Sequence, residues 1–268
     1  MKDKILSFDV DMTLLNDNTN SIPDSALEAI EKVRENHYIV IATGRDLSQP
    51  MNQFILEAVK PDAFVHINGM KVTIEGEDVI DKKFGHELAS EVIKFADEHK
   101  LGVMTLVDGI QYYSRKEVLD ELKNIVVFNT EDILERDLAP IEGVNLERIY
   151  AMGLVAKDDE AKKLQVAFPQ IKVTEVFHNF WYDVVVKGMS KSLGMETLLK
   201  HFNKKWSDVI AFGDSMNDYE IMADAGFSVA MGNASPKVKE IADFITDDID
   251  KDGIAKAIEK LFEKNIMN

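Results

Sequence analysis

Short apolar runs alternate with helix-period segments near the start of this 268-residue chain. Apolar runs lie at Ile5–Phe8, Tyr38–Ala42 and Ala63–Ile67, and helical periodicity covers Ser25–Glu35 and Leu47–Ala58 between them. Strand, helix and strand in this order indicate a parallel sheet with helices on both faces. The start of the chain is therefore predicted to belong to an α/β domain.

The same alternation returns near the other end of the chain. The segments expected there are a helix over Lys191–Phe202, a strand at Val209–Phe212, a helix over Asp218–Ala223, a strand at Phe227–Ala230, and helices over Pro236–Ala242 and Ile254–Phe262. We expect these elements to complete the α/β domain that the first segment begins.

The middle of the chain follows a different pattern. Gly102–Ser114 reads as two strands joined by Asp108-Gly109, a strong hairpin sequence. Arg148–Val155 and the long run Val173–Val186 are strand-like, and helical periodicity covers Glu87–His99 and Asp158–Phe168. We therefore predict an α+β unit over residues 82–187, inserted into an α/β domain made of residues 1–81 and 188–268.

Charge and cysteine content exclude several classes of function. The chain has 31 Lys and Arg against 48 Asp and Glu, a formal charge of −17, so a nucleic acid would meet like charge over much of the surface. Cysteine is absent, which excludes disulfides, thiolate metal sites and a cysteine nucleophile. A small-molecule substrate is expected rather than a nucleic acid.

No membrane segment is expected. Two aspartates, Asp9 and Asp11, interrupt the first apolar run, which therefore does not form the apolar core of a secretory leader. No stretch approaches the roughly 18 consecutive apolar residues of a membrane-spanning helix. We expect a cytoplasmic protein that makes no membrane contact and is a monomer or a weak homodimer.

Two aspartates follow the first predicted strand. In open α/β sheets, ligands collect outside the carboxyl ends of the strands. One carboxylate of the pair Asp9 and Asp11 can act as a nucleophile, while the other can donate a proton to a leaving group and then act as a base on water. An isolated Asp-x-Asp is more often a strand end capped by solvated acids.

Three further polar clusters lie at predicted strand or helix ends. Thr43-Gly44 offers a hydroxyl and backbone amides to a phosphate oxygen. Lys191, with Lys187 as the alternative, places an ammonium group at a helix N-terminus. Asp214 and Asp218 lie close enough in sequence for a hard-cation site, although helix N-capping explains one of them equally well.

Taken in order, these clusters resemble the four motifs of the haloacid dehalogenase-like (HAD) superfamily of phosphohydrolases. The matching residues are Asp9-x-Asp11-x-Thr13, Thr43-Gly44-Arg45, Lys191 and Gly213-Asp214-x-x-Asn217-Asp218. Asn68-Gly69, Gly188-Met189-Ser190-Lys191, Val229–Ala234 and Asp252-Gly253-Ile254 are similar to the Cof-type sugar-phosphatase branch.

The resemblance implies a Rossmann-like three-layer α/β/α core with a parallel sheet. It also implies that the inserted α+β unit is a cap domain of the C2B type, which determines substrate specificity. Two positions depart from the family, because Met12 and Ser215 stand where glycine is usual or frequent. Neither substitution removes a functional group.

The resemblance also assigns roles to the acidic residues. It implies that Asp9 attacks phosphorus to form an aspartyl-phosphate, and that Asp11 protonates the leaving oxygen and then activates water. Mg²⁺ would be held by the carboxylates of Asp9 and Asp214 and by the backbone carbonyl of Asp11. Asp218 would stand behind these ligands and orient Lys191 or a metal-coordinated water.

Four residues are expected to bind the phosphoryl oxygens. The resemblance gives this role to Thr43, Gly44 and Lys191, with Asn217 as a weaker candidate. In the inserted unit, His178 and Trp181 lie in an aromatic segment that suits a sugar or nucleotide ring. The same segment is equally consistent with packing inside the unit.

Together these inferences predict a Mg²⁺-dependent phosphatase that acts on small phosphorylated metabolites, either sugar phosphates or related phosphomonoesters. A phosphomutase of the same fold and a non-catalytic metabolite-binding protein remain as alternatives, with Met12 the only hint of the second. A kinase or an ATPase pump is disfavoured, because the sequence has no Gly-x-x-x-x-Gly-Lys-Ser/Thr loop and no membrane segment.

Overall fold

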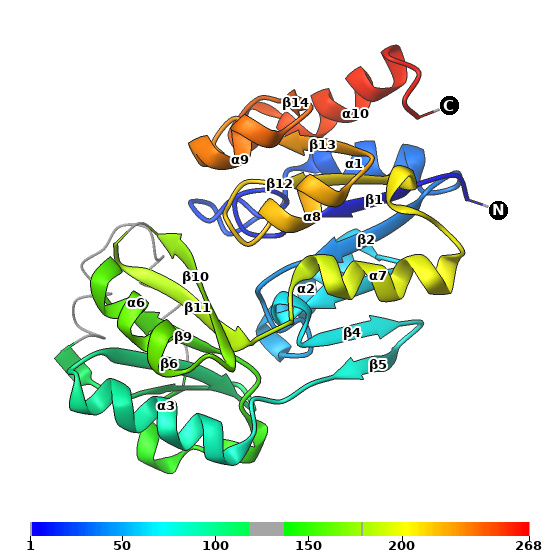
Figure 1. Cartoon of the computed structure of the whole chain (residues 1–268). Coiled ribbons are helices and arrows are strands. Elements are labelled where there is room, and N and C mark those ends of the chain that lie inside the picture. The colour runs from blue at the N-terminus through cyan, green and yellow to red at the C-terminus, as the bar shows by residue number, and fades with distance from the viewer. Residues whose placement is uncertain (1, 118–136, 178, 268) are drawn as a thin grey trace. The chain divides into compact units, whose positions relative to one another are not determined.

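A computed structural model describes residues 2–117, 137–177 and 179–267 of the chain (Figure 1). The chain divides into two compact units. The core unit comprises Met1–Ser48, Asn52–Ile80 and Ser190–Asn268, and the inserted unit comprises Asp81–Met189 together with Gln49–Met51. Every helix within the described residues is too short or too polar to cross a membrane.

The core unit is built on an eight-stranded sheet with the order β14-β13-β12-β1-β2-β3-β4-β5. The six strands from β14 to β3 pair in parallel, which confirms the predicted parallel sheet. The strands are β1 Ile5–Phe8, β2 Tyr38–Ala42, β3 Ala63–His66, β4 Lys71–Ile74, β5 Glu77–Asp81, β12 Val209–Gly213, β13 Phe227–Ala230 and β14 Phe244–Ile245.

One edge of the core sheet differs from the prediction. Strand β4 pairs antiparallel with β3, and β5 follows it at the edge, so the sheet is mixed. The physical reason is the short turn Ile67–Gly69 between β3 and β4, whose three residues have left-handed backbone conformations and return the chain at once. A second turn at Glu75 and Gly76, also left-handed, then leads from β4 to β5. The parallel expectation is wrong for this edge only.

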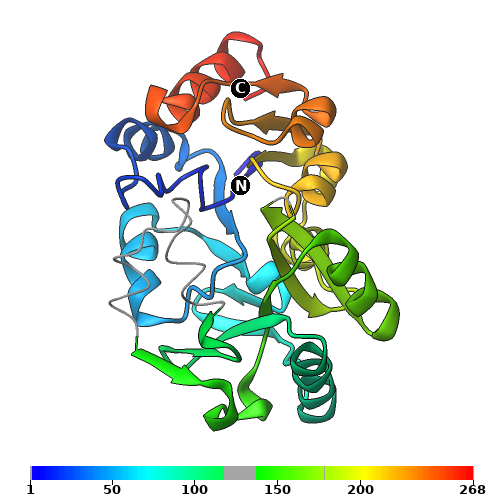
Figure 2. The ribbon, with the colours of Figure 1, turned by 90° about the vertical axis from the view of Figure 1, so that its left-hand side faces the viewer.

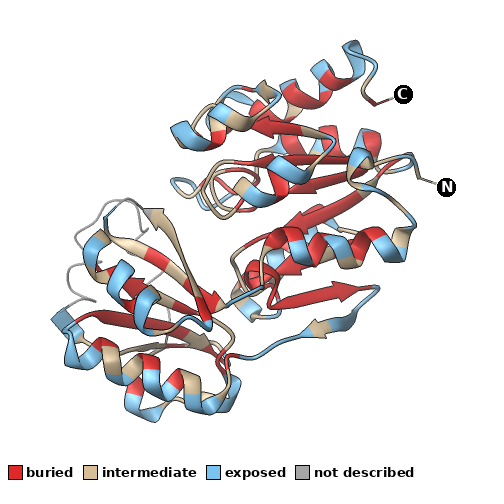
Figure 3. Cartoon of the chain, in the orientation of Figure 1, coloured by how far each residue is buried: buried red, intermediate tan, exposed pale blue. Residues whose placement is uncertain are grey.

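Helices cover both faces of the core sheet. On one face α1 (Asp24–Val33) packs against α10 (Gly253–Glu263) and α2 (Gln53–Val59), and on the other α7 (Lys191–Phe202) packs against α8 (Tyr219–Asp224) (Figures 1 and 2). Helix α9 (Pro236–Ile241) follows β13 and contacts it. The predicted three-layer α/β/α core is confirmed, and its central strands are buried throughout (Figure 3).

The helix expected over Leu47–Ala58 begins later than predicted. A 3₁₀ turn covers Pro50–Asn52, and the α-helix proper starts at Gln53. Pro50 lacks an N–H and restricts the residue before it, so a helix can begin at Pro50 but cannot continue through it. The other 3₁₀ turns are η2 Ile67–Gly69, η3 Ile141–Gly143, η4 Leu146–Arg148, η5 Trp206–Asp208 and η6 Ile249–Lys251.

The inserted unit has a six-stranded sheet of its own, with the order β10-β11-β9-β6-β7-β8. Its pairs are antiparallel except for β7 and β8, which are parallel. Its elements are β6 Gly102–Val107, β7 Ile110–Tyr113, β8 Asp137–Pro140, β9 Met152–Val155, β10 Ile171–Phe177, β11 Trp181–Val186, α3 His86–Glu98 and α6 Asp158–Ala167.

The long strand-like run at Val173–Val186 is two strands rather than one. Strands β10 and β11 form an antiparallel pair, and Asn179 between them has a left-handed φ of 55°. This unit also has a separate hydrophobic core, in which Leu154 and Leu164 are fully buried. An inserted α+β unit was predicted, and the structure shows that fold.

Candidate active site

The first catalytic candidate, Asp9, directly follows the central strand β1. Its backbone N–H donates to the carbonyl of Phe212 at 3.1 Å, which extends the pairing of β1 with β12 by one residue. Its side chain is buried. The parallel pairing of β1 and β12 brings Asp9 to the sheet edge where β12 also ends.

The loop after Asp9 is held by backbone hydrogen bonds. The carbonyl of Val10 accepts the N–H groups of Thr13, Leu14 and Leu15. Met12 adopts a left-handed conformation with φ of 56°, and its carbonyl accepts a hydrogen bond of 2.8 Å from the side-chain amide of Asn233. Met12 therefore occupies a backbone conformation that glycine adopts more readily.

Lys191 is the centre of the buried charge network. Its Nζ lies 2.6 Å from Oδ1 of Asp9, 2.6 Å from Oδ1 of Asp218 and 3.2 Å from Oδ1 of Asn217. Only 1% of Lys191 is exposed. A lysine can be buried to this extent only when charged and polar partners replace its hydration. Both carboxylates raise its pKa and keep it protonated, although burial alone would lower that pKa.

Asp218 uses both of its carboxylate oxygens within the protein. Oδ1 accepts from Lys191, while Oδ2 accepts the backbone N–H groups of Asp214 and Ser215 at 3.1 Å each. The close approach depends on Gly213, where a Cβ would lie 2.6 Å from the carboxylate carbon of Asp218. Asp218 therefore fixes both the lysine and the backbone that carries Asp214.

Three carboxylates form a cluster that can hold a metal ion. One oxygen each from Asp9, Asp214 and Asp218 lies within 4.8 Å of the others. Thr13 donates its hydroxyl to Oδ1 of Asp214 at 3.4 Å. Lys191 contacts two of the three carboxyl groups, so negative charge is in excess there once all three are ionised. Oxygen ligands with excess negative charge suit a hard divalent cation such as Mg²⁺.

Burial changes the acidity of the cluster. Burial and then the neighbouring charge of Asp218 raise the pKa of Asp9 to about 8, against an ordinary value of 3.8. Burial likewise raises the pKa of Asp214 well above its ordinary value, with the charges of Asp9 and Asp218 acting in the same direction. A bound dication would favour the ionised forms of both carboxylates.

Asp11 is held by a different cation. The guanidinium of Arg45 contacts Oδ1 of Asp11 through Nη2 at 2.6 Å and Nε at 2.8 Å, and its Nη1 donates to Asn52 at 3.2 Å. Burial acts to raise the pKa of Asp11, but the charge and hydrogen bonds of Arg45 outweigh it and lower that pKa. The two aspartates therefore have opposite protonation tendencies.

The predicted phosphate-binding loop follows β2, the strand that pairs with β1. Thr43 is completely buried; its N–H donates to the carbonyl of Val65, and its hydroxyl oxygen accepts the N–H of Arg45 at 3.1 Å. Gly44 lies between Thr43 and Arg45 and is partly exposed. Thr43 and Gly44 therefore lie at the same sheet edge as Asp9. The hydroxyl of Thr43 and the backbone N–H of Gly44 are the two hydrogen-bond donors in question.

Of the two substrate-contact candidates in the inserted unit, the structure describes only Trp181. His178 lies outside the described residues. Trp181 begins β11, and its indole lies so close to Gly153 that a Cβ there would be 2.2 Å from Cζ2. It also packs with Met104 and Val155 in a small apolar cluster. Packing therefore accounts for Trp181 in this unit, and its contact with substrate stays a prediction.

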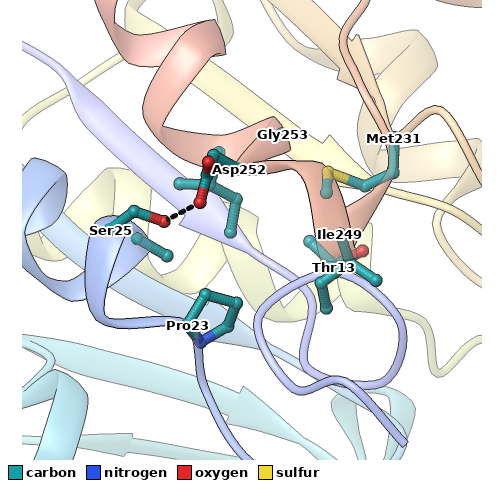
Figure 4. A pocket seen from close by; sticks show the side chains of 9 residues that line it. Thr13, Pro23, Ser25, Met231, Ile249, Asp252 and Gly253 are labelled. Atoms are coloured by element: carbon teal, nitrogen blue, oxygen red, sulfur yellow. Dashed lines mark hydrogen bonds between the residues drawn. The ribbon is translucent and has the colours of Figure 1, made fainter. Parts of the chain in front are cut away.

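The Asp252-Gly253-Ile254 motif lies beside a narrow hollow next to the loop that follows Asp9. Thr13, Pro23, Met231 and Ile249 line it, and Ser25 donates to Asp252 at 2.6 Å beside it (Figure 4). The hollow is too narrow for a water molecule. The Asp252-Gly253-Ile254 motif thus joins the start of α10 to the start of α1 and has a structural role.

Arg45, Ser215 and Asn68 are hydrogen-bonded to the site, although reasoning from the sequence assigned them no role. Ser215 donates its hydroxyl to Oδ1 of Asn217 at 2.7 Å, and Asn68 accepts from Nδ2 of Asn217 at 3.3 Å. All three lie inside the quoted motifs or at a departure from them. The family motif was the available indication, but side-chain partners so distant in sequence could not be inferred from it.

The three-layer fold, with a buried carboxylate–lysine cluster at its strand ends, is the fold of a hydrolase class that known proteins share. The chain belongs to the haloacid dehalogenase-like hydrolase family, whose model matches residues 6–258. The predicted family is thereby confirmed, and with it the prediction that the chain is an enzyme of the phosphoric monoester hydrolase class.

Curated and solved relatives extend over nearly the whole chain. "Putative phosphatase YkrA" of Bacillus subtilis (strain 168) is 32% identical over 264 residues, covering 97% of this chain and 98% of the relative. The subclass IIB sugar phosphatase BT4131 has a TM-score of 0.83 at 26% identity, covering 97% of this chain and 99% of that one. BT1666 from Bacteroides thetaiotaomicron has a TM-score of 0.84 at 27% identity, with 97% and 96% covered.

Proposed function

We propose that this protein is a Mg²⁺-dependent phosphatase that hydrolyses small phosphorylated metabolites through an aspartyl-phosphate formed on Asp9. The observation that carries the proposal is the buried contact of Asp9 with Lys191, with Asp214 in the same cluster. A nucleophile, a cation for the phosphoryl group and an acidic metal site meet there. These are the requirements of phosphoryl transfer to a carboxylate.

The reaction uses Asp9 and Asp11 in two displacements. A carboxylate oxygen of Asp9 bonds to phosphorus while the bond from phosphorus to the leaving oxygen breaks, and Asp11 gives that oxygen a proton. Asp11 then removes a proton from water, whose oxygen attacks phosphorus, releases inorganic phosphate and regenerates Asp9. Because Arg45 favours the ionised form of Asp11, Asp11 must loosen its contact with Arg45 in order to carry the proton.

The cluster fits Mg²⁺ by its donor chemistry. The carboxylates of Asp9 and Asp214 and the backbone carbonyl of Asp11 would hold the ion. When bound there, Mg²⁺ would supply positive charge that reduces the repulsion between an anionic nucleophile and an anionic substrate. Both carboxylate oxygens of Asp218 already accept hydrogen bonds, from Lys191 and from two backbone amides. This favours a role in orienting Lys191 rather than direct ligation of the metal.

Phosphoryl oxygens are bound by Thr43, the Gly44 amide and Lys191, with Asn217 beside the lysine. The charge on these oxygens grows in the transition state, so preformed donors lower its free energy more than that of the ground state. Asp218 holds the ammonium group of Lys191 in place. Substrate binding therefore does not have to order this side chain.

The substrate class follows from the relatives and the inserted unit. YbjI of Escherichia coli (strain K12), 28% identical, is named a 5-amino-6-(5-phospho-D-ribitylamino)uracil phosphatase, and BT4131 is described as a sugar phosphatase. The substrate in each of these names is a phosphate ester of a polyhydroxylated carbon chain. We extend this class to the present chain, with the inserted unit as the specificity cap and His178 and Trp181 as candidate contacts.

The purified protein, assayed for phosphate release on a panel of phosphorylated metabolites, tests the proposal. Activity is expected with Mg²⁺, and EDTA should remove it reversibly. Asp9→Asn should lower kcat on the order of 10⁴- to 10⁶-fold with the fold retained, because an amide cannot attack phosphorus. Full turnover by folded Asp9→Asn would exclude this nucleophile, and conversion of a sugar phosphate to its isomer without phosphate release would indicate a phosphomutase.

A further inference from the structure

The turn η2, Ile67–Gly69, has three consecutive left-handed residues. The φ angles of Ile67, Asn68 and Gly69 are 53°, 51° and 85°. A left-handed conformation is costly for a non-glycine residue, and most of all for a β-branched one such as Ile67. All three residues of the turn are buried, and packing in the core does not explain their backbone conformation. Such strain persists only where the surrounding structure imposes it, and it often lies at functional sites.

Backbone contacts hold this turn against the proposed site. The N–H of Asn68 donates to the carbonyl of Thr43, and the N–H of Ile67 donates to that of Arg45, each at 3.0 Å. On the other side, a Cβ on Gly69 would lie 2.1 Å from the carbonyl oxygen of Ser190, the residue before Lys191. The turn is therefore placed between the phosphate-binding loop and the start of the lysine helix.

The side chain of Asn68 reaches the lysine through Asn217. Nδ2 of Asn217 donates to Oδ1 of Asn68 at 3.3 Å. Oδ1 of Asn217 accepts from Lys191 at 3.2 Å and from the hydroxyl of Ser215 at 2.7 Å. An amide oxygen accepts and an amide nitrogen donates, so these contacts permit one orientation of the Asn217 amide.

This orientation completes the hydrogen bonding of the lysine. An ammonium group has three N–H donors, and Lys191 has three acceptors in Asp9, Asp218 and Asn217. The contact with Asn217 is the longest and the only one to a neutral group. It is consequently the weakest of the three and the one whose geometry depends most on the groups that orient the Asn217 amide.

We propose that Asn68 is a positioning residue for phosphate-ester hydrolysis, which fixes the amide of Asn217 together with Ser215 so that its oxygen faces Lys191. The inference rests on the proposed function, because it assumes that Lys191 binds the phosphoryl group. It also gives Ser215 a role, since glycine at that position would remove one of the two groups that hold the Asn217 amide.

Replacement of Asn68 by glycine tests this inference. Glycine accepts the left-handed backbone without strain, so Asn68→Gly removes the side chain and leaves the turn. We expect kcat to fall roughly five- to tenfold for every phosphomonoester, the loss typical of one hydrogen bond, with KM changed less than about twofold. Ser215→Ala should have the same effect, and Ser215→Thr, which keeps the hydroxyl, should restore most of the activity.

Two controls separate positioning from a general structural role. Asn203 also has a left-handed φ, 52°, but caps the exposed end of α7, so Asn203→Gly should leave kcat unchanged. In an Asn217→Ala background, Asn68→Gly and Ser215→Ala should cause no further loss, because the residue they act through is gone. An undiminished loss in that background, or wild-type kcat in Asn68→Gly, would overturn the inference.

A spectroscopic measurement keeps the inference independent of turnover. In ¹H–¹⁵N spectra, the side-chain amide signals of Asn217 can be identified by their absence in Asn217→Asp. These signals should shift in Asn68→Gly and stay in place in Asn203→Gly. Unchanged signals in Asn68→Gly would overturn the inference. Absence of phosphatase activity in the wild type, with the shift observed, would overturn the proposed function and leave only the placement of the Asn217 amide by Asn68.

Discussion

Nζ of Lys191 lies 2.6 Å from Oδ1 of Asp9, and both side chains are almost completely buried. The pair joins the end of the first strand to the first residue of a helix 182 residues later. Lys191 contacts Asp218 as well, and Asp214 lies in the same cluster, so one ammonium faces an excess of carboxylates. The stability of the fold is therefore linked at this position to the proposed metal site and catalytic residues.

Lys191→Met should be strongly destabilising, because it leaves buried carboxylates without their cation. We expect a loss of about 3–5 kcal/mol in the free energy of unfolding, measured by urea denaturation at neutral pH without metal. Lys200→Met is the matched control, since Lys200 lies on the same helix but is exposed, and it should remain close to wild type. Wild-type stability of Lys191→Met would contradict the assigned ion pair.

Stability of the metal-free protein should fall as pH rises from about 4 to about 8. The pKa of Asp9 is raised from 3.8 to about 8 in the folded state, so in this interval the folded protein keeps a proton that the unfolded chain releases. Saturating Mg²⁺ should oppose the fall, by about 2.7 kcal/mol at 100 times its Kd. Melting temperatures from pH 5 to 9, with and without Mg²⁺, measure both effects.

Two substitutions serve as checks on the pH dependence. Asp9→Asn should flatten the decline between pH 5 and 8, because it removes the titrating group. Asp250→Asn, an exposed acid in η6, should leave both the decline and the Mg²⁺ effect unchanged. A wild-type profile for Asp9→Asn would show that another group causes the dependence.

Arg45→Met should move the alkaline limb of the kcat/KM profile to higher pH. Arg45 lowers the pKa of Asp11, so its removal raises that pKa and keeps Asp11 protonated, and able to donate to the leaving group, at higher pH. A shift of roughly one unit or more is expected from the loss of an adjacent opposite charge. Arg45→Lys, which keeps the charge, should shift the limb less, and an unchanged limb in Arg45→Met would disprove the coupling.

Met12 should tolerate glycine but not a β-branched residue. Its φ of 56° suits glycine, so Met12→Gly should stay within about 1 kcal/mol of wild type in the free energy of unfolding. Met12→Val should lose about 1–3 kcal/mol and bind Mg²⁺ less tightly, because the strained backbone displaces the neighbouring carbonyl of Asp11. Thermal denaturation and calorimetric Mg²⁺ titration of the two variants decide this prediction.

The inserted unit and the core unit should respond differently to substitution. Trp181→Ala should change the order of substrates in kcat/KM, while hydrolysis of p-nitrophenyl phosphate survives, because this small ester requires little recognition beyond the phosphoryl group. Lys191→Ala should depress all substrates together. Equal losses for every substrate in Trp181→Ala, or an unaffected panel in Lys191→Ala, would contradict this division.

Gly153→Ala provides a control for the packing of Trp181. It displaces the indole without removing it, because the new Cβ would meet Cζ2 at 2.2 Å. If Trp181 contributes only to packing, the two substitutions should both destabilise the inserted unit and leave the substrate order unchanged. A change of order in Trp181→Ala alone would support substrate contact.

The sequence was sufficient for the elements with a strong apolar pattern. Tyr38–Ala42 and Phe227–Ala230 are strands with the predicted bounds, because buried parallel strands are continuous apolar runs. The edge strand β5 was not predicted, since its residues are mostly exposed and begin with Glu77 and Asp78. Charged residues protect an exposed edge from further pairing. The same residues remove the apolar alternation by which a strand is predicted from its sequence.

For the site, sequence motifs located the polar groups but not their pairings. Asp9, Lys191 and Asp218 were each singled out, and the fold brings them together. The contact of Arg45 with Asp11 and that of Asn68 with Asn217 depend on which strand ends are neighbours and on side-chain rotamers. Neither can be derived from spacing along the chain.

The order of strands in the core sheet constrains the synthesis of the protein. Strand β1 is flanked by β2 on one side and by β12, Val209–Gly213, on the other. A nascent chain that has completed only the inserted unit therefore presents an open, apolar edge of β1, and carries Asp9 without Lys191. Such an intermediate is prone to edge-to-edge association and lacks the cation of the proposed active site. We therefore expect the proposed activity to arise late in translation, and a prematurely terminated product to be a target for chaperones and proteases rather than a weakened enzyme.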